Sequence, residues 1–170
     1  MRLAFSIALS IGVVVLDQAT KRFFEITFAD AGHVAPVTPF FNLVLVHNRG
    51  VSFGLLSSGH QYAPYLLALV GVAIVTRLSL WLGRSSSGVQ RLALAAIIGG
   101  AISNIVDRLD DGAVTDFLDF HLGIYHWPAF NLADVAITCG VAALLFESLW
   151  PKTRTIETPG RTGSSRTHRP

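Results

Sequence analysis

Four long apolar segments divide this chain, and they restrict its fold more than any other feature. They run from about Leu3 to Phe24, from Tyr62 to Leu82, from Leu92 to about Val106, and from Phe130 to Trp150. A helix needs about 20 apolar residues to cross a bilayer, and the second and fourth segments meet that length. The third is short, so a spanning helix there must include Asn104 and Arg108 in its last turn. That end should face protein or water rather than lipid.

The composition agrees with a membrane protein. Hydrophobic residues make up 51% of the chain and charged residues 14%, which is more apolar than a typical soluble domain. We expect one mainly α domain over residues 1–152, with outer β and lid segments at about 25–60 and 109–129. A polar, disordered cytoplasmic tail is expected over 153–170. Asp17 and Lys21 continue the first segment as a polar-ended helix, so we predict that it is not a cleaved signal peptide.

Charge placement predicts the orientation in the membrane. If the N-terminus is cytoplasmic, four crossings return the C-terminus to the cytoplasm, and most basic residues fall on that side, as the positive-inside rule requires. The basic residues on the cytoplasmic side are Arg2, Arg77, Arg84, Arg91, Lys152, Arg154, Arg161, Arg166 and Arg169, and those on the outer side are Lys21, Arg22, Arg49 and Arg108. The basic residues form no stripe with interleaved aromatics, so we expect no nucleic-acid partner.

This orientation collects polar residues from distant parts of the sequence on the outer face of the membrane. They are Asp17, Asn48, Asn104, Arg108, Asp116, Asn131 and Asp134. A single outward-facing site explains this clustering better than chance does. Ionisable residues at membrane depth are costly and are functional-site candidates.

The segments between the helices predict a small extracytoplasmic sheet. Phe40 to Val46 is rich in β-branched and aromatic residues and follows turn residues, which is typical of a strand. Thr115 to His121 alternates, so Asp116 and Asp119 lie on opposite strand faces and only one of them can point inward. Val51 to Leu56 is expected to be a short interfacial helix or loop that covers the site as a lid.

Asp116 and Asp134 are the residues whose chemistry suggests catalysis. Two close carboxyl groups do not both ionise easily, so one keeps a proton while the other can activate water. Each has a simpler explanation: Asp116 as a solvated loop acid, and Asp134 as a favourable charge near a helix N-terminus. A proton channel would need carboxylates spread through the membrane depth, and a structural subunit would tolerate Asn at either position.

Several other residues would support such a site. Asn131 lies three residues before Asp134, so they share a helix face, or Asn131 caps that helix. Asp17 and Lys21 form an i, i+4 pair that we interpret as structural. The remaining candidates are Gly100, Asn104 and Arg108 in one helical stripe, and Asn48 with Gly50 in a turn after the first strand.

Metal binding is not expected. His47, His121 and His126 lack a compact ligand spacing. The single cysteine, Cys139, lies in an apolar run and is interpreted as a small buried hydrophobe. No cofactor is therefore predicted.

The chain resembles the bacterial lipoprotein signal peptidases, also called signal peptidase II, through an ordered set of motifs. These are Leu16-Asp17-Gln18-Ala19-Thr20-Lys21, Asn48-Arg49-Gly50-Val51-Ser52-Phe53-Gly54, Gly99-Gly100-Ala101-Ile102-Ser103-Asn104-Ile105-Val106-Asp107-Arg108, Val114-Thr115-Asp116-Phe117 and Pro128-Ala129-Phe130-Asn131-Leu132-Ala133-Asp134. Any one of these motifs is a weak signal for the family, but the complete set in this order is highly specific for it. Thr115 is a mild departure, because family members often have an aliphatic residue there.

The resemblance implies an aspartyl endopeptidase of the inner membrane with Asp116 and Asp134 as its catalytic pair, and it favours Asp116 over Asp119. It implies cleavage of diacylglyceryl-modified prolipoproteins on the N-terminal side of the lipidated cysteine. Membrane lipids would surround the enzyme. Asp17, Asn48, Gly100, Asn104, Arg108 and Asn131 match positions that support or line the family's site. We expect a monomer, because the site is complete within one chain.

Overall fold

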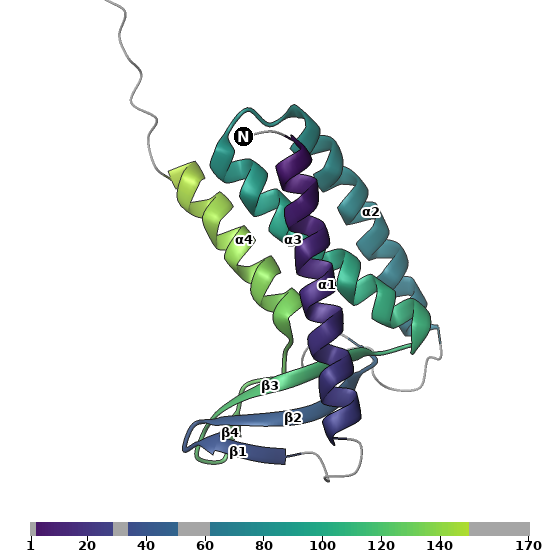
Figure 1. The fold of residues 1–170 in the computed structure, drawn as a ribbon, viewed down its shortest axis with the longest axis vertical. Coiled ribbons are helices and arrows are strands. Elements are labelled where there is room, and N and C mark those ends of the chain that lie inside the picture. Colours follow the sequence, from purple (N-terminus) through teal and green to yellow (C-terminus); the bar gives the residue numbers. More distant parts are fainter. Residues whose placement is uncertain (1–2, 29–33, 51–61, 150–170) are drawn as a thin grey trace, which may run out of the picture.

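The computed structural model describes residues 3–28, 34–50 and 62–149, and within them it has four helices and four strands. The helices are α1 (Leu3–Phe28), α2 (Ala63–Arg84), α3 (Gly88–Asp110) and α4 (Leu132–Leu149). The strands are β1 (Val34–Thr38), β2 (Phe41–Asn48), β3 (Val114–Leu122) and β4 (Tyr125–His126). The helices form a bundle, and the sheet lies across one end of it (Figure 1).

All four helices are long and apolar enough to cross a membrane, which confirms the predicted spans. The chain is a multi-pass membrane protein. Two helices are longer than the apolar segments that predicted them. α1 continues about one turn past Phe24, and α3 continues about one turn past Val106. In α3 this continuation carries Asp107 and Arg108 to the end of the bundle that meets the sheet.

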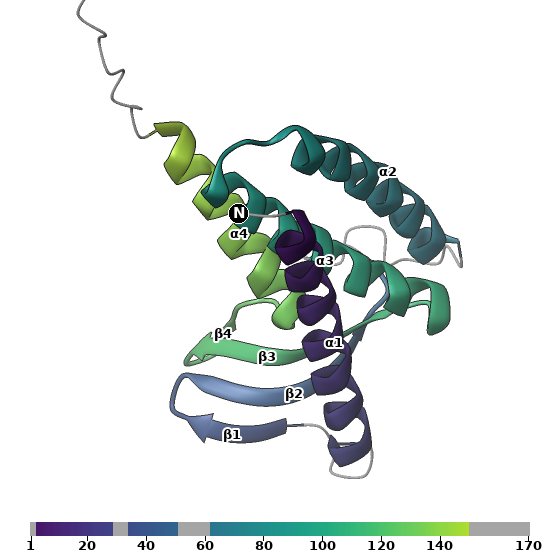
Figure 2. The same ribbon diagram turned by 45° about the horizontal axis from the view of Figure 1, so that its top comes forward.

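α3 is the central helix. Half of its most apolar window is buried, whereas the corresponding windows of the other helices are 11% buried and present their apolar side chains outward. Figure 2 shows α2 on one side of α3 and α1 and α4 on the other. Small residues let the neighbours approach: a Cβ at Gly99 would lie 2.6 Å from the Ser10 carbonyl oxygen, and one at Gly140 would lie 2.7 Å from that of Ala93.

The sheet is antiparallel throughout, in the order β1-β2-β3-β4. Strands were predicted near Phe40–Val46 and Thr115–His121, and β2 and β3 confirm them. β1 was missed, because Pro36 made its segment look like a turn. Proline lacks the N–H that a central strand needs, but an edge strand tolerates it, and β1 is an edge.

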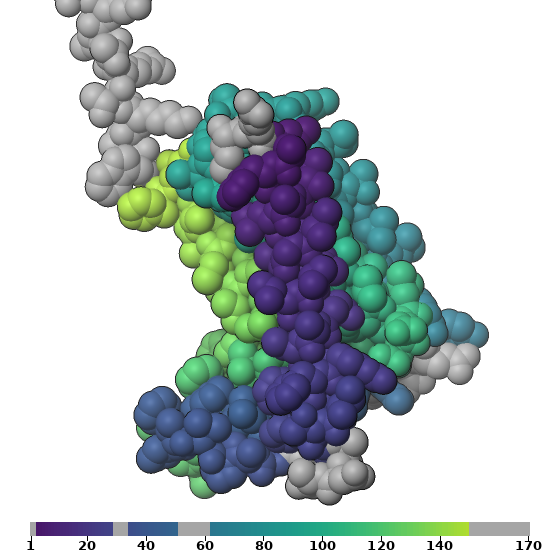
Figure 3. All heavy atoms as spheres, in the orientation of Figure 1, coloured from purple at the N-terminus to yellow at the C-terminus, as the bar shows by residue number. Residues whose placement is uncertain are grey.

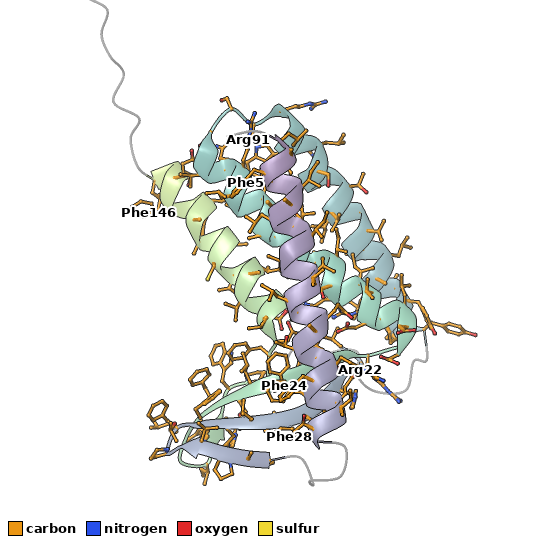
Figure 4. All side chains as sticks on the ribbon, in the orientation of Figure 1. Phe5, Arg22, Phe24, Phe28, Arg91 and Phe146 are labelled. Atoms are coloured by element: carbon orange, nitrogen blue, oxygen red, sulfur yellow. The ribbon has the colours of Figure 1, made fainter. Side chains whose placement is uncertain are left out.

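The last turns of α1 run past the other helices and hold the sheet. The ring of Phe24 stacks on that of Phe117 in β3, with centroids 4.4 Å apart, and Thr115 Oγ1 donates to Glu25 Oε1 at 2.9 Å. Figure 4 shows Phe24 and Phe28 on this end of α1, beside the strands. Thr115, the departure from the usual family pattern, thus ties β3 to α1.

Two predictions fall outside the described residues. The lid expected at Val51–Leu56 lies in the undescribed range 51–61, and the tail expected over 153–170 lies within 150–170. The prediction of a single domain over residues 1–152 is not tested by the structure and stays a prediction.

Candidate active site

Asp116 and Asp134 line the same cavity at the end of the bundle that meets the sheet. Asp116 comes from β3 and is 2% exposed, whereas Asp134 lies in the first turn of α4. The cavity holds about 280 Å³. Its walls are polar on the sheet and α3 side and apolar on α2, and the lining residues are Asn48, Gly50, Leu67, Val70, Gly71, Ile74, Asn104, Arg108, Val114, Asp116 and Asp134.

Asn131 contacts both carboxyl groups and is completely buried. Its Nδ2 donates to Asp116 Oδ1 at 2.7 Å. Its Oδ1 accepts from the backbone N–H of Asp134 at 2.9 Å, and its own backbone N–H donates to Asp134 Oδ2 at 3.4 Å. This reciprocal pattern is a capping box at the start of α4. Asn131 is thus both the cap of α4 and a site residue, because the same hydrogen bonds that cap the helix hold Asp134 beside Asp116.

Two more asparagines complete the hydrogen bonding. Asn48 Nδ2 donates to Asp116 Oδ2 at 3.2 Å, and Asn104 Nδ2 donates to Asp134 Oδ1 at 2.9 Å. Asn48 is itself held by the backbone N–H of Gly50, which donates to its Oδ1 at 3.1 Å. Every oxygen of the two carboxyl groups thus accepts an N–H. Amide donors orient a carboxyl group without cancelling its charge, so the two acids still repel each other when both are ionised.

The electrostatics of the pair keep a proton on it. Burial, followed by the nearby charge of Asp134, raises the pKa of Asp116 from 3.8 to about 7. The hydrogen bonds from Asn48 and Asn131 act in the opposite direction but do not offset the burial. A carboxyl group with a pKa in this range can give or accept a proton near neutral pH.

A buried ion cluster lies behind the cavity, between α1 and α3. Lys21 Nζ lies 2.6 Å from Asp17 Oδ2 and 2.7 Å from Asp107 Oδ2. Asp17 also accepts from the backbone N–H of Ala133 at 2.8 Å, so it holds the first turn of α4. The predicted Asp17–Lys21 pair is therefore present, and its contacts extend to the helix that carries Asp134.

Asp107 is part of this cluster, although it was not among the predicted site residues. It is 6% exposed and accepts from Gln18 Nε2 at 2.5 Å and from the backbone N–H of Thr115 at 3.4 Å. Ser103, one turn earlier, donates to Asp17 Oδ2 at 2.8 Å. The spacing of Ser103 and Asp107 on one face of α3 is the sequence signal that would have revealed them.

Arg108 and Gly100 take different places around the acids. Arg108 lines the cavity and donates from NH1 to the Asn104 carbonyl oxygen at 2.9 Å. It forms no ion pair with any described residue, and the neighbouring acid Asp107 pairs with Lys21 instead. Gly100 lies where α3 meets α4, and a Cβ there would overlap the Ala133 carbonyl oxygen.

Asp119 occupies the other face of β3, as the alternation predicted. It accepts from Asn42 Nδ2 at 2.9 Å and lies 2.9 Å from His126 Nδ1. Burial acts to raise the pKa of Asp119, but the hydrogen bonds from Asn42 and His126 outweigh it and hold that pKa below its usual value. Within the described ranges, no group of three or more His, Cys, Asp or Glu side chains is arranged to bind a metal ion.

Comparison with known proteins identifies the family. Residues 9–150 match the family described as "Signal peptidase (SPase) II", Peptidase_A8. The chain belongs to the signal peptidase II family. It is an aspartic peptidase of the signal peptidase II type, and the predicted activity is confirmed at that level.

Relatives of this signal peptidase II include proteins named "Lipoprotein signal peptidase". One from Burkholderia mallei (strain SAVP1) is 44% identical over 146 residues, which cover 84% of this chain and 86% of the relative. One from Paraburkholderia phymatum is 47% identical over 140 residues, covering 81% and 82%. A solved structure, described as a bacterial membrane enzyme obtained by the in meso method at 2.3 Å resolution, superimposes with a TM-score of 0.76. It is 27% identical, and the match covers 93% of this chain and 95% of that one.

The signal peptidase II fold brings the predicted site residues together in layers. Asp116, Asp134, Asn48, Gly50, Asn104 and Arg108 line the cavity. Asn131 lies beneath both acids, and Asp17 and Lys21 lie behind Asn104 and the start of α4. Gly100 is farther along α3 and sets the distance between α3 and α4 rather than lining the cavity.

Proposed function

We propose that Asp116 and Asp134 form the catalytic dyad of a membrane endopeptidase that removes signal peptides from diacylglyceryl-modified prolipoproteins. Cleavage falls on the N-terminal side of the lipidated cysteine. The observation that carries the proposal is that both carboxyl groups line one cavity and are oriented through a shared residue, Asn131. The relatives named lipoprotein signal peptidase support this substrate class.

In this mechanism the dyad carries one proton while the substrate is bound. The ionised carboxylate removes a proton from a water molecule as that water attacks the scissile carbonyl carbon. The protonated partner donates to the carbonyl oxygen. When the tetrahedral intermediate collapses, the C–N bond breaks and a proton passes to the leaving nitrogen. Because the two acids titrate as a unit, the starting proton belongs to the pair.

The substrate suits the position of the site in the membrane. The beginning of α1 and the end of α4 lie at the end of the bundle opposite the sheet (Figure 1). We place that opposite end in the cytoplasm, following the basic residues, so the dyad lies at the extracytoplasmic side. A lipid anchor on the cysteine would hold the scissile bond at the same depth. Both acids and the three asparagines that bind them belong to one chain, which supports a monomer.

The test is cleavage of a synthetic diacylglyceryl-modified prolipopeptide by the purified protein in lipid vesicles. Asp116→Asn and Asp134→Asn should each lose activity nearly completely while keeping the helical far-UV circular dichroism spectrum. Asp119→Asn is the matched control, because Asp119 lies on the opposite face of the same strand, and it should cleave at close to the wild-type rate. A chelator should leave the rate unchanged. Wild-type-like cleavage by either dyad variant would end the assignment.

A further inference from the structure

Asp134 borders two cavities, and none of the other described residues lines both of them. The first is the cavity of about 280 Å³ described above, which continues onto α2. The second holds about 490 Å³ and lies on the other side of Asp134, between α4 and the segment that joins β4 to α4. The Asp134 carboxyl group therefore lies at the boundary between the two cavities.

The lining of the second cavity is mostly apolar, and its polar side chains include Asp134 and Thr138. Its roof is formed by Trp127, Pro128 and Phe130, and its wall by α4 side chains that include Val135 and Thr138. Trp127 is 66% exposed, and such aromatic residues concentrate at the interface between bilayer and water. The sheet projects sideways past the bundle, so the molecular surface turns inward where the sheet and α4 meet (Figure 3). In the membrane orientation proposed above, we place this cavity beside lipid near the membrane surface.

We propose that the second cavity binds an acyl chain of the substrate's diacylglyceryl group, while the first cavity takes the peptide. This inference rests on the proposed function. The lipidated cysteine supplies the leaving nitrogen, so its sulfur is only a few bonds from the scissile bond. A pocket for the lipid must therefore begin beside the dyad, and the second cavity does so at Asp134. The first cavity suits a peptide better, because its lining includes the polar side chains of Asn48, Asn104 and Arg108.

The chemistry of the lining argues against two other occupants. A phospholipid headgroup carries a phosphate, but none of the described residues that line the second cavity is cationic, and the charged residue among them is the acid Asp134. A signal-peptide helix would need a long groove, but the α4 wall runs only from Asp134 to Cys139, about 8 Å along the helix axis. A neutral, narrow hydrocarbon chain fits both restrictions and can continue from there into the bilayer.

The first experiment maps the chain directly. Asp116→Asn protein, which keeps the Asp134 wall, is mixed in vesicles with prolipopeptide bearing a diazirine on one acyl chain and then illuminated. We expect adducts on residues 127–130 and 135–139. A phosphatidylcholine with a diazirine on one acyl chain should label the same residues, because that chain can enter from the bilayer while the headgroup stays outside the cavity. Unlabelled prolipopeptide should displace it. Adducts confined to α2, or phosphatidylcholine labelling that substrate does not reduce, would overturn the proposal.

The second experiment uses chain length. Thr138→Trp fills the cavity and should lower kcat/KM for a dipalmitoyl substrate by about tenfold or more, because several methylene groups lose their burial. A dioctanoyl substrate should lose much less. The matched control is Leu69→Trp on the lipid-facing side of α2, which is 66% exposed and lines neither cavity. Equal losses for both chain lengths would refute the acyl site. If wild-type protein cleaved neither substrate, the proposed function itself would fail.

Discussion

Lys21 donates from Nζ to Oδ1 of Asn104 at 2.9 Å, and this contact determines which way the Asn104 amide faces. With its oxygen held by the ammonium group, the amide must direct Nδ2 toward Asp134, which it reaches at 2.9 Å. The reverse orientation would place an NH₂ group against a cation and an oxygen against a carboxyl group. A buried charge on α1 thus orients a donor to the dyad without touching either acid.

Replacing Lys21 should therefore damage both the fold and the site. Lys21→Met leaves Asp17 and Asp107 buried without their cation, and breaking such a pair costs about 3–5 kcal/mol. We expect a much lower unfolding temperature in detergent and reduced cleavage at temperatures where the variant is still folded. Arg22→Met is the matched control, because the Arg22 side chain is 74% exposed and its pair with Glu25 spans 3.3 Å. It should cost about 1 kcal/mol or less, and equal losses from the two variants would contradict the model of a buried cluster.

The pKa of Asp116 predicts that this residue costs stability at neutral pH. Its pKa is raised from 3.8 to about 7 by burial and by Asp134, so the folded state binds the proton more tightly than the unfolded state. The stability that this group contributes is present below pH 3.8 and is lost as the pH rises through about 7. Asp116→Asn, which cannot ionise, should be inactive yet gain thermal stability relative to wild type as the pH rises from about 4 to 8. A difference that does not change with pH would contradict this.

Asp119 should show the opposite dependence. Although burial acts against it, hydrogen bonds from Asn42 and His126 lower the pKa of Asp119, so its stabilisation is present above the unfolded pKa and lost as the pH falls through the folded one. Asp119→Asn should therefore be less stable than wild type at neutral pH, and the difference should shrink in acid. Thermal unfolding curves across the same pH series would measure both effects. A stabilised Asp119→Asn variant at neutral pH would be inconsistent with these contacts.

The rate of cleavage should depend on pH through the same pair. Above the Asp116 pKa of about 7, both acids become ionised and the proton needed for the carbonyl oxygen is lost, so kcat/KM should fall on the alkaline side. In strong acid both acids become protonated and no base remains, which gives a bell-shaped profile. Initial rates measured across the pH range with one lipidated peptide test this. A constant rate between pH 6 and about 9 would point to other groups.

Much of the fold followed from pattern alone. Hydropathy predicted all four helices, and the one-sided placement of Asp17, Asn104 and Asp134 predicted a single site, because antiparallel crossings bring alternate helix ends together. The face of Asp119 also followed from alternation. These features depend on periodicity and membrane depth, which a sequence displays directly.

Contacts between distant segments were harder to foresee. In the sequence, Asp107 is one polar residue in the last turn of the third helix, and only the approach of α1 to α3 makes it a partner of Lys21. Asn131 can orient both acids only because the segment before α4 pairs with β3 in one register, in which Leu118 and Phe130 form a bridge. Such pairings require three-dimensional distances, and several registers are compatible with the same alternation.

Gly100 offers a test of how closely α3 must approach α4 to position Asp134. A Cβ at Gly100 would overlap the Ala133 carbonyl oxygen and lie 2.9 Å from Ile137 Cγ1. Gly100→Ala should therefore push the helices apart, cost about 1–3 kcal/mol of stability and slow cleavage. Gly12→Ala is the matched control, since nothing lies within 4 Å of its added Cβ, and alanine there should stabilise α1 by up to about 1 kcal/mol. Unfolding temperature and kcat measured for both variants decide the matter, and a Gly100→Ala enzyme as stable and active as Gly12→Ala would refute the close approach.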